Sequence, residues 1–199
     1  SEYYIIPGFV DLHCHGGGGF DTMDGVQAIK KMSSYHLSKG TTSLLATTWT
    51  SSFDHTFAAL SNFNSLMSMD SNLLGVHLEG PFINPKKLGA QPSKTINPSI
   101  EFIEKIQDVA PIKVITLAPE LDGMDDFIDK LDKLGINIQF GHSLADYHCC
   151  SKFMKKYSLF RQHFLNIFQS LCNIILGSSK TKSYIIITSL SKSSARDYC

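Results

Sequence analysis

Four side chains of types that bind divalent cations stand in sequence contexts that favour a metal site: His13, His15, Glu79 and His142. The two histidines near the start are two positions apart in an extended run, so both imidazoles lie on one face of a strand and can hold one ion. Glu79 follows an apolar run and leads into a Gly-Pro turn, and His142 follows another apolar run as a third potential ligand. The glycines at 16–19 predict a turn beside this site more than a phosphate cradle.

Other histidines and acids have less distinctive surroundings. His77 shares a strand face with Glu79, and we expect it to support the site without binding the ion. Glu120 follows Pro119 and is interpreted either as a ligand or as a structural carboxylate. His36 and His55 are expected to be ordinary surface residues.

The apolar pattern alternates between strand-like and helix-like segments. Successive parallel strands need a long crossover, so this alternation predicts an α/β fold with a parallel sheet covered by helices. The candidate ligands stand at the carboxyl ends of different strands, where a (β/α) barrel or an open doubly wound sheet places its chemistry. The predicted strands cover 10–15, 41–48, 73–78, 112–117 and 136–140. The predicted helices cover 25–39, 54–69 and 124–134, and Asp54 is predicted to cap the second of them.

Composition narrows the class of protein. The 199 residues are 43% hydrophobic and 18% charged, which predicts an ordinary folded core. The formal net charge is zero, so we expect neither nucleic acid nor a membrane surface as a partner. No apolar run has the length of a bilayer span and no signal segment is visible, which predicts a cytoplasmic location. The five cysteines are odd in number and lack metal-site spacing, so reduced thiols are expected.

The last quarter of the chain has a different character. Acidic residues recur up to Asp146, and after it only Asp197 remains, while Ser and Lys crowd the end. A natural polar tail is one explanation, and a shift of reading frame near Tyr147 is the other. The predicted division is therefore a barrel over 1–146, with strands one to five, and a divergent tail over 147–199.

Four motifs in order carry a resemblance to a known family: PGFVDLHCHGGGG, GVHLEGPFINPKKLGAQP, ITLAPE and GHS. Together they resemble the N-acetylglucosamine-6-phosphate deacetylases of the amidohydrolase superfamily, over residues 5–145. HLEGPF with a downstream GAQP separates this family from dihydroorotases and ureases, whose metal-bridging lysine has no counterpart here. The resemblance implies a partial (β/α)8 TIM-type barrel and a metal-dependent hydrolase of amino sugar metabolism, acting on a sugar phosphate and dimeric in complete members.

The resemblance also implies a set of metal ligands. Glu79 matches the family's ligand glutamate, and His142 matches the first of two later ligand histidines. His163 has the spacing of the second, in surroundings that fit the family poorly. His13 and His15 match the pair that binds a second ion in two-metal members, so the implied cofactor is one or two ions of Zn or Fe.

Substrate contacts are implied in the same way. Ala90 and Gln91 match the segment that contacts the sugar phosphate, where some members carry a histidine at the second position. Asn166 stands three positions after His163, as the family's substrate-binding asparagine does.

Parts of the family pattern are absent from the sequence. The small amino-terminal β domain, the closing strands and the aspartate that acts as general base and acid have no counterpart, and Asp197 stands in no comparable setting. We therefore identify no catalytic residue and predict little or no deacetylation by this chain alone. Two other classes stay open: another amidohydrolase, such as a cyclic-amide hydrolase or deaminase, and a non-catalytic remnant that binds sugar phosphate or nothing.

Overall fold

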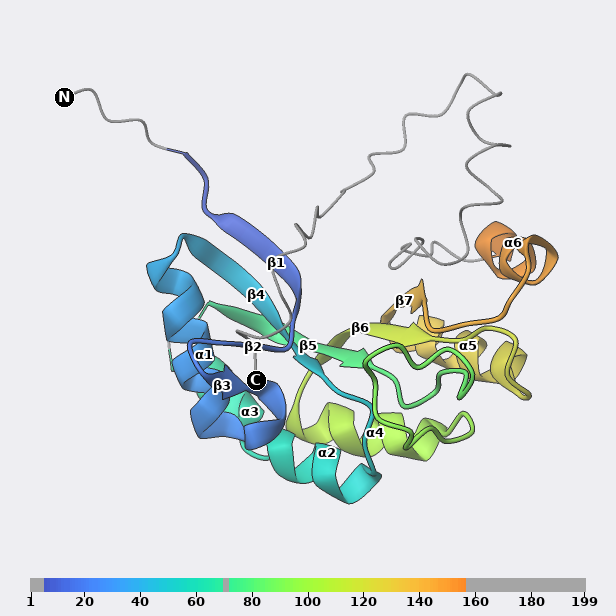
Figure 1. Cartoon of the computed structure of the whole chain (residues 1–199), viewed down its shortest axis with the longest axis horizontal. Coiled ribbons are helices and arrows are strands. Elements are labelled where there is room, and N and C mark those ends of the chain that lie inside the picture. Colours follow the sequence, from blue (N-terminus) through green and yellow to red (C-terminus); the bar gives the residue numbers. More distant parts are fainter. Residues whose placement is uncertain (1–5, 70–71, 157–199) are drawn as a thin grey trace.

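A five-stranded parallel sheet forms the centre of the protein, for which a computed structural model describes residues 6–69 and 72–156. The spatial order of the strands is the order along the chain, and the sheet curls like half of a barrel (Figure 1). A doubly wound sheet reverses its strand order at a switch point, so this alternative is excluded. The strands are β1 (Phe9–Cys14), β4 (Thr41–Thr48), β5 (Leu73–Glu79), β6 (Ile112–Leu117) and β7 (Asn137–Phe140).

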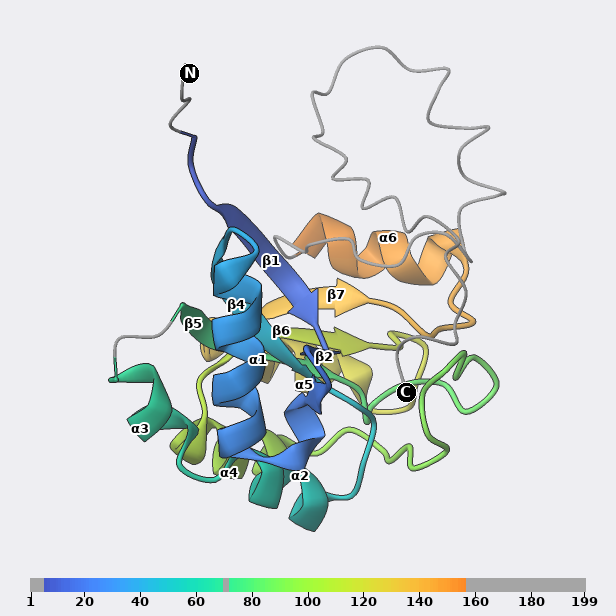
Figure 2. The same cartoon turned by 60° about the vertical axis from the view of Figure 1, so that its left-hand side comes forward.

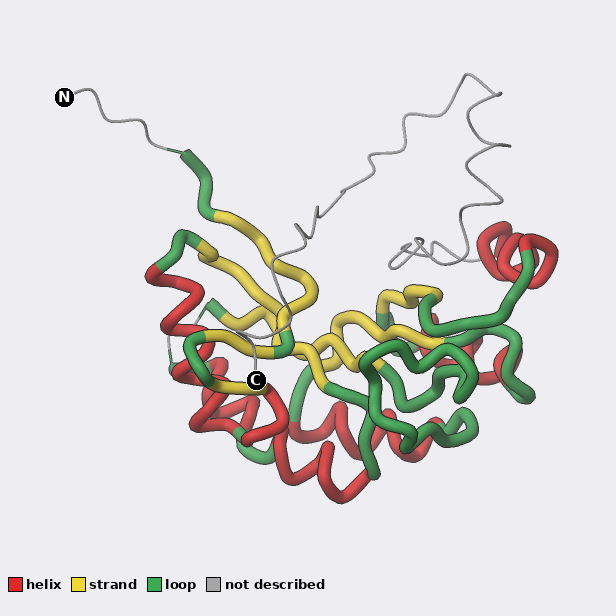
Figure 3. Tube along the Cα trace, viewed as in Figure 1, coloured by secondary structure: helices red, strands yellow, loops and turns green. Residues whose placement is uncertain are grey.

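Helices follow the strands and cover the outer face of the curled sheet, as Figures 2 and 3 show. Parallel neighbours require such crossovers, because a tight turn cannot return the chain to the same end of the sheet. The α/β prediction and the partial-barrel prediction are both confirmed. The helices are α1 (Val26–Ser38), α2 (Phe53–Leu60), α3 (Phe63–Met67), α4 (Ile100–Val109), α5 (Met124–Lys133) and α6 (Tyr147–Lys156).

The hydrophobic core lies between the sheet and these helices. Phe82, just after β5, is fully buried, and its ring meets Phe102 of α4 and Phe127 of α5 edge-on. Ile29 and Met32 carry the buried face of α1. The apolar face of each helix thus packs against the apolar strands that the helix covers.

Two helix predictions need correction. The segment from 54 to 69 forms two helices, because Asn62 takes a left-handed conformation with φ of 69° that interrupts the hydrogen-bond ladder. Ser52, and not Asp54, caps α2, since its side chain accepts a hydrogen bond from the His55 amide. The pattern analysis did not single out α4, which Ser99 caps in the same way.

The glycine run forms a turn, as predicted, and the turn belongs to a short hairpin. Strands β2 (Gly16–Gly17) and β3 (Phe20–Asp21) pair antiparallel, and a 3-10 helix, η1 (Thr22–Asp24), follows. Gly18 and Gly19 at the turn have φ of 63° and 82°, which glycine adopts at little cost. Gly17 has no room for a side chain, because an added Cβ would lie 2.3 Å from the His36 ring.

Beyond residue 146 the structure describes one more helix. Phe153 of α6 packs against Phe140 of β7, and Lys152 pairs with Asp125 of α5 at 2.6 Å. The boundary predicted at 146 remains a prediction, and residues 157–199 lie outside the described part of the chain. None of the helices described is both long and apolar enough to cross a membrane.

Candidate metal centre

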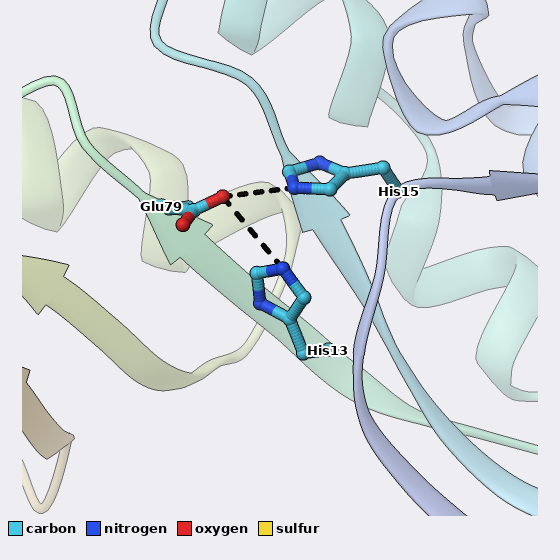
Figure 4. A group of neighbouring side chains, drawn as sticks. All are labelled: His13, His15 and Glu79. Atoms are coloured by element: carbon cyan, nitrogen blue, oxygen red, sulfur yellow. Dashed lines mark ion pairs between the residues drawn. The ribbon is translucent and has the colours of Figure 1, made fainter. Parts of the chain in front are cut away.

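Glu79 is the centre around which the other polar side chains gather. It is the last residue of β5, and its side chain is only 2% exposed. A carboxylate so deeply buried requires charged or hydrogen-bonding partners. Its Oε2 atom faces His13 and His15 (Figure 4), and its Oε1 atom faces His142.

His13 of β1 and His15, which directly follows the end of that strand at Cys14, point into the same space, as predicted. The Nε2 atom of His15 is 2.8 Å from Glu79 Oε2, and the Nε2 atom of His13 is 3.9 Å from the same oxygen. One nitrogen from each ring and one carboxylate oxygen all lie within 4.8 Å of one another. This spacing suits donors that share an ion.

His142 completes the arrangement from the loop after β7. Its Nδ1 atom lies 2.9 Å from the Lys87 carbonyl oxygen, which can only accept, so Nδ1 carries a proton. Its Nε2 atom, 3.0 Å from Glu79 Oε1, then meets an acceptor and needs either a second proton or a cation between the two. The hydrogen bond to Glu79 raises the pKa of His142, against the opposing effect of burial.

Gln91 also contacts the central carboxylate. Its Nε2 atom donates to Glu79 Oε2 at 2.7 Å, and its Oε1 atom accepts from the Thr50 amide at 2.7 Å. Both ends of this buried side chain are therefore engaged by the protein, while Ala90 beside it is exposed. The substrate contacts of these two residues stay predictions, and the sequence analysis missed the bond to Glu79.

The other two candidates, His163 and Asn166, lie outside the described residues.

His77 lies fully buried behind the site. Burial, with the nearby His13 ring, lowers the pKa of His77 to about 3, so the ring is neutral and carries one proton. Its Nδ1 atom is 3.2 Å from the Leu12 carbonyl oxygen and 3.3 Å from His13 Nδ1, and its Nε2 atom is 2.7 Å from the Thr116 hydroxyl. These contacts suit the supporting role that we expected for it.

Glu120, left open by the sequence, holds two loops together. Its carboxylate accepts hydrogen bonds from Asn84 at 2.8 Å and from the Ser143 hydroxyl and Leu144 amide at 2.5 Å each. The side-chain amide of Asn84 makes the bond to Glu120, and its backbone N–H group donates to the His142 carbonyl oxygen. His142 has an unusual positive φ of 51°, and the bonds on either side of it maintain that conformation. The geometry therefore favours the structural interpretation of Glu120.

Replacing Glu120 with alanine should destabilise the protein, because three donors lose a charged acceptor. We expect a loss of about 2 kcal/mol in the free energy of unfolding, measured by urea denaturation. Glu104→Ala, which changes an exposed acid on α4, is the matched control. An unchanged unfolding midpoint for Glu120→Ala would show that these bonds contribute little.

The prediction for His36 is wrong, whereas His55 is exposed as expected. His36 is half-buried against the first strand, with its Nε2 atom 3.2 Å from Cys14 Sγ and 3.1 Å from the Gly16 carbonyl oxygen. Burial raises the pKa of the Cys14 thiol to about 12, so this pair joins a neutral thiol to an imidazole. His36 lies on α1 and packs against Cys14 at the end of β1, so we assign it a packing role.

The fold and this site define a class of protein: a partial α/β barrel whose imidazoles and carboxylate meet at the carboxyl ends of the strands. The model of the Amidohydrolase family matches residues 4–164, and the chain belongs to this family. The family generally uses a divalent metal, and the His13, His15 and Glu79 group can hold one.

Within the family, the similar proteins are deacetylases of amino sugar phosphates. The N-acetylglucosamine-6-phosphate deacetylase of Bacillus subtilis is 41% identical over 73% of this chain. The crystal structure of the Thermotoga maritima N-acetylglucosamine-6-phosphate deacetylase matches with a TM-score of 0.67 and 37% identity over 75% of this chain. An N-acetylgalactosamine-6-phosphate deacetylase of Escherichia coli is 31% identical over 71%.

These matches cover only part of each relative. The chain spans 39% of the Bacillus subtilis protein, 41% of the Thermotoga maritima chain and 39% of the Escherichia coli protein.

Proposed function

We propose that this chain carries the metal centre and part of the substrate site of an N-acetylglucosamine-6-phosphate deacetylase. The reaction is hydrolysis of the acetamide to glucosamine 6-phosphate and acetate. The observation that supports it best is the buried Glu79 carboxylate, with His15 and His142 each within 3.0 Å of one of its oxygens. The names of the relatives support the substrate class.

The donor set fits a divalent cation such as Zn or Fe. In this proposal Glu79 and His142 hold one ion, and His13 with His15 holds a second or shares the first. Oriented imidazole nitrogens and a buried carboxylate are the ligands that these metals favour, and the proton on His142 Nδ1 leaves Nε2 as the donor. A divalent cation would supply Lewis acidity, which lowers the pKa of water and polarises a carbonyl group.

The other acidic side chains near the site accept hydrogen bonds from protein groups, and so we assign them a positioning role and not proton transfer. Asp11 accepts from the His13 amide, Asp21 accepts from Trp49, and Glu120 accepts from three donors. Hydrolysis of an amide needs a group that takes a proton from water and gives it to the departing amine. Among the described residues we assign that role to none, and we propose that the 199-residue chain by itself deacetylates slowly or not at all.

The second candidate substrate is N-acetylgalactosamine 6-phosphate, which the Escherichia coli relative favours through its name. The two sugars differ only in the configuration of one hydroxyl group. The contacts that Glu79 makes among the described residues do not discriminate between the two sugars, so the test includes both.

The test measures metal content and acetate release on the purified 199-residue chain. We expect one or two ions of Zn or Fe per chain by elemental analysis, and little or no acetate release from N-acetylglucosamine 6-phosphate, with any such release lost in Glu79→Gln. A chain that retains no metal would contradict the proposed centre. Hydrolysis of cyclic amides, with both sugar phosphates inert, would favour the other amidohydrolase class, and rapid turnover would contradict the proposed low activity.

His163 as a ligand, Asn166 as a substrate contact, the dimer and the cytoplasmic location are further parts of the proposal.

A further inference from the structure

Trp49 lies directly after β4 and stacks on the ring of His15. The two ring centroids are 3.8 Å apart and the planes differ by 14°, so the rings lie almost parallel. The indole therefore covers one face of an imidazole whose Nε2 atom is 2.8 Å from Glu79. Offset stacking is one of the two favoured arrangements of aromatic pairs, and in this arrangement the indole restrains the plane of the imidazole.

His15 differs from His142 in what holds its second ring nitrogen. In His142, Nδ1 donates to a backbone carbonyl group. In His15, Nδ1 is buried and has no hydrogen-bond partner among the described residues. A histidine that binds a metal is usually oriented by a hydrogen bond on its other nitrogen, so the orientation of His15 must come from elsewhere.

Trp49 is itself held in place. Its Nε1 atom donates to Asp21 Oδ2 at 2.9 Å, and the other oxygen of Asp21 accepts from the Met23 amide at 2.8 Å. Asp21 pairs with Gly16 in the β2–β3 hairpin, and the Thr22 amide donates to the His15 carbonyl oxygen at 2.8 Å. These contacts connect the backbone of His15, through Asp21 and Trp49, to the imidazole ring of His15.

From these contacts we infer that Trp49 is a positioning residue for His15. The Asp21–Trp49 pair takes the place of the missing hydrogen bond on His15 Nδ1. The inference rests on the proposed metal centre and adds a residue to it. Trp49 contacts the imidazole of His15 and would not itself bind the ion. Removal of the indole should therefore leave His15 as a ligand but orient its ring less well.

The test compares the affinity of three variants for Zn²⁺ with that of the unaltered chain, by competition with a chelating dye. Trp49→Ala removes the ring, and we expect the dissociation constant to rise about tenfold, as for other residues that orient a ligand. Trp49→Phe keeps a ring for stacking and loses the bond to Asp21, so its affinity should lie between that of Trp49→Ala and that of the unaltered chain. Tyr147→Ala, which removes an exposed ring on α6, is the matched control and should bind as the unaltered chain does.

Thermal unfolding in the presence of EDTA separates positioning from general stability. A structural role alone would lower the unfolding temperature of Trp49→Ala and leave the zinc affinity of its folded fraction unchanged. That outcome would overturn the inference.

Emission from Trp49 supplies a second readout, because it is the single tryptophan of the chain. We expect Zn²⁺ to change its fluorescence in a saturable way, and His15→Asn to abolish the change. Bound zinc with unaltered emission would overturn the inference and leave the metal centre intact. Failure of the unaltered chain to bind zinc at all would overturn both.

Discussion

Glu79→Gln is expected to weaken cation binding by at least about 100-fold, more than the loss of any group that only orients a ligand. The substitution keeps the shape of the side chain and removes its charge. Among residues 6–69 and 72–156, Glu79 is the one whose carboxylate oxygens face the imidazoles of His13, His15 and His142. A neutral amide would place hydrogens against some of their nitrogens. Elemental analysis of the purified protein, followed by chelator competition, measures the effect.

Glu101→Gln is the matched control for this experiment. It makes the same chemical change on α4, where an exposed Glu101 pairs with Lys105 at 2.6 Å. The metal content of Glu101→Gln should equal that of the unaltered chain. Equal metal in Glu79→Gln and Glu101→Gln would mean that the ion binds elsewhere and that the proposed centre is wrong.

The second large effect is expected from Phe82→Ala, which should lower the free energy of unfolding by about 3–5 kcal/mol. Phe82 is fully buried, and its ring centroid lies 5.5 Å from that of Phe102 and 4.9 Å from that of Phe127. Truncation removes both edge-to-face contacts and leaves a cavity between β5 and two helices. Urea denaturation in the presence of EDTA measures the loss without a contribution from bound metal.

Leu74→Ala provides the comparison for this core substitution. Leu74 lies on β5 and is 41% exposed, so its truncation should change the free energy of unfolding by less than about 1 kcal/mol. If Phe82→Ala costs no more than Leu74→Ala, the aromatic cluster does not contribute to stability as the structure implies.

Several elements were predictable because local pattern determines them. The apolar runs before Glu79 and His142 form strands wherever they can be buried, and parallel pairing then aligns their carboxyl ends. The two-residue spacing of His13 and His15 places both rings on one face of an extended chain. These features depend on backbone geometry alone, and the structure agrees with all of them.

Other elements were not predictable because they depend on partners distant in the sequence. Asn62 interrupts a helical pattern through its backbone conformation, which no apolar periodicity reveals. His36 looked like a surface residue until packing placed it against Cys14.

By itself, the sequence determined the type of fold and the ligand types, since periodicity and residue chemistry are local properties. Only the tertiary structure decided which groups support them: Gln91 against Glu79, Glu120 beside His142, and Trp49 on His15. The reason is physical. The fold brings together side chains that are 12 positions apart, as in Gln91 and Glu79, or 63 positions apart, as in His142 and Glu79. Hydrogen bonds and stacking at such separations leave no periodic trace along the chain.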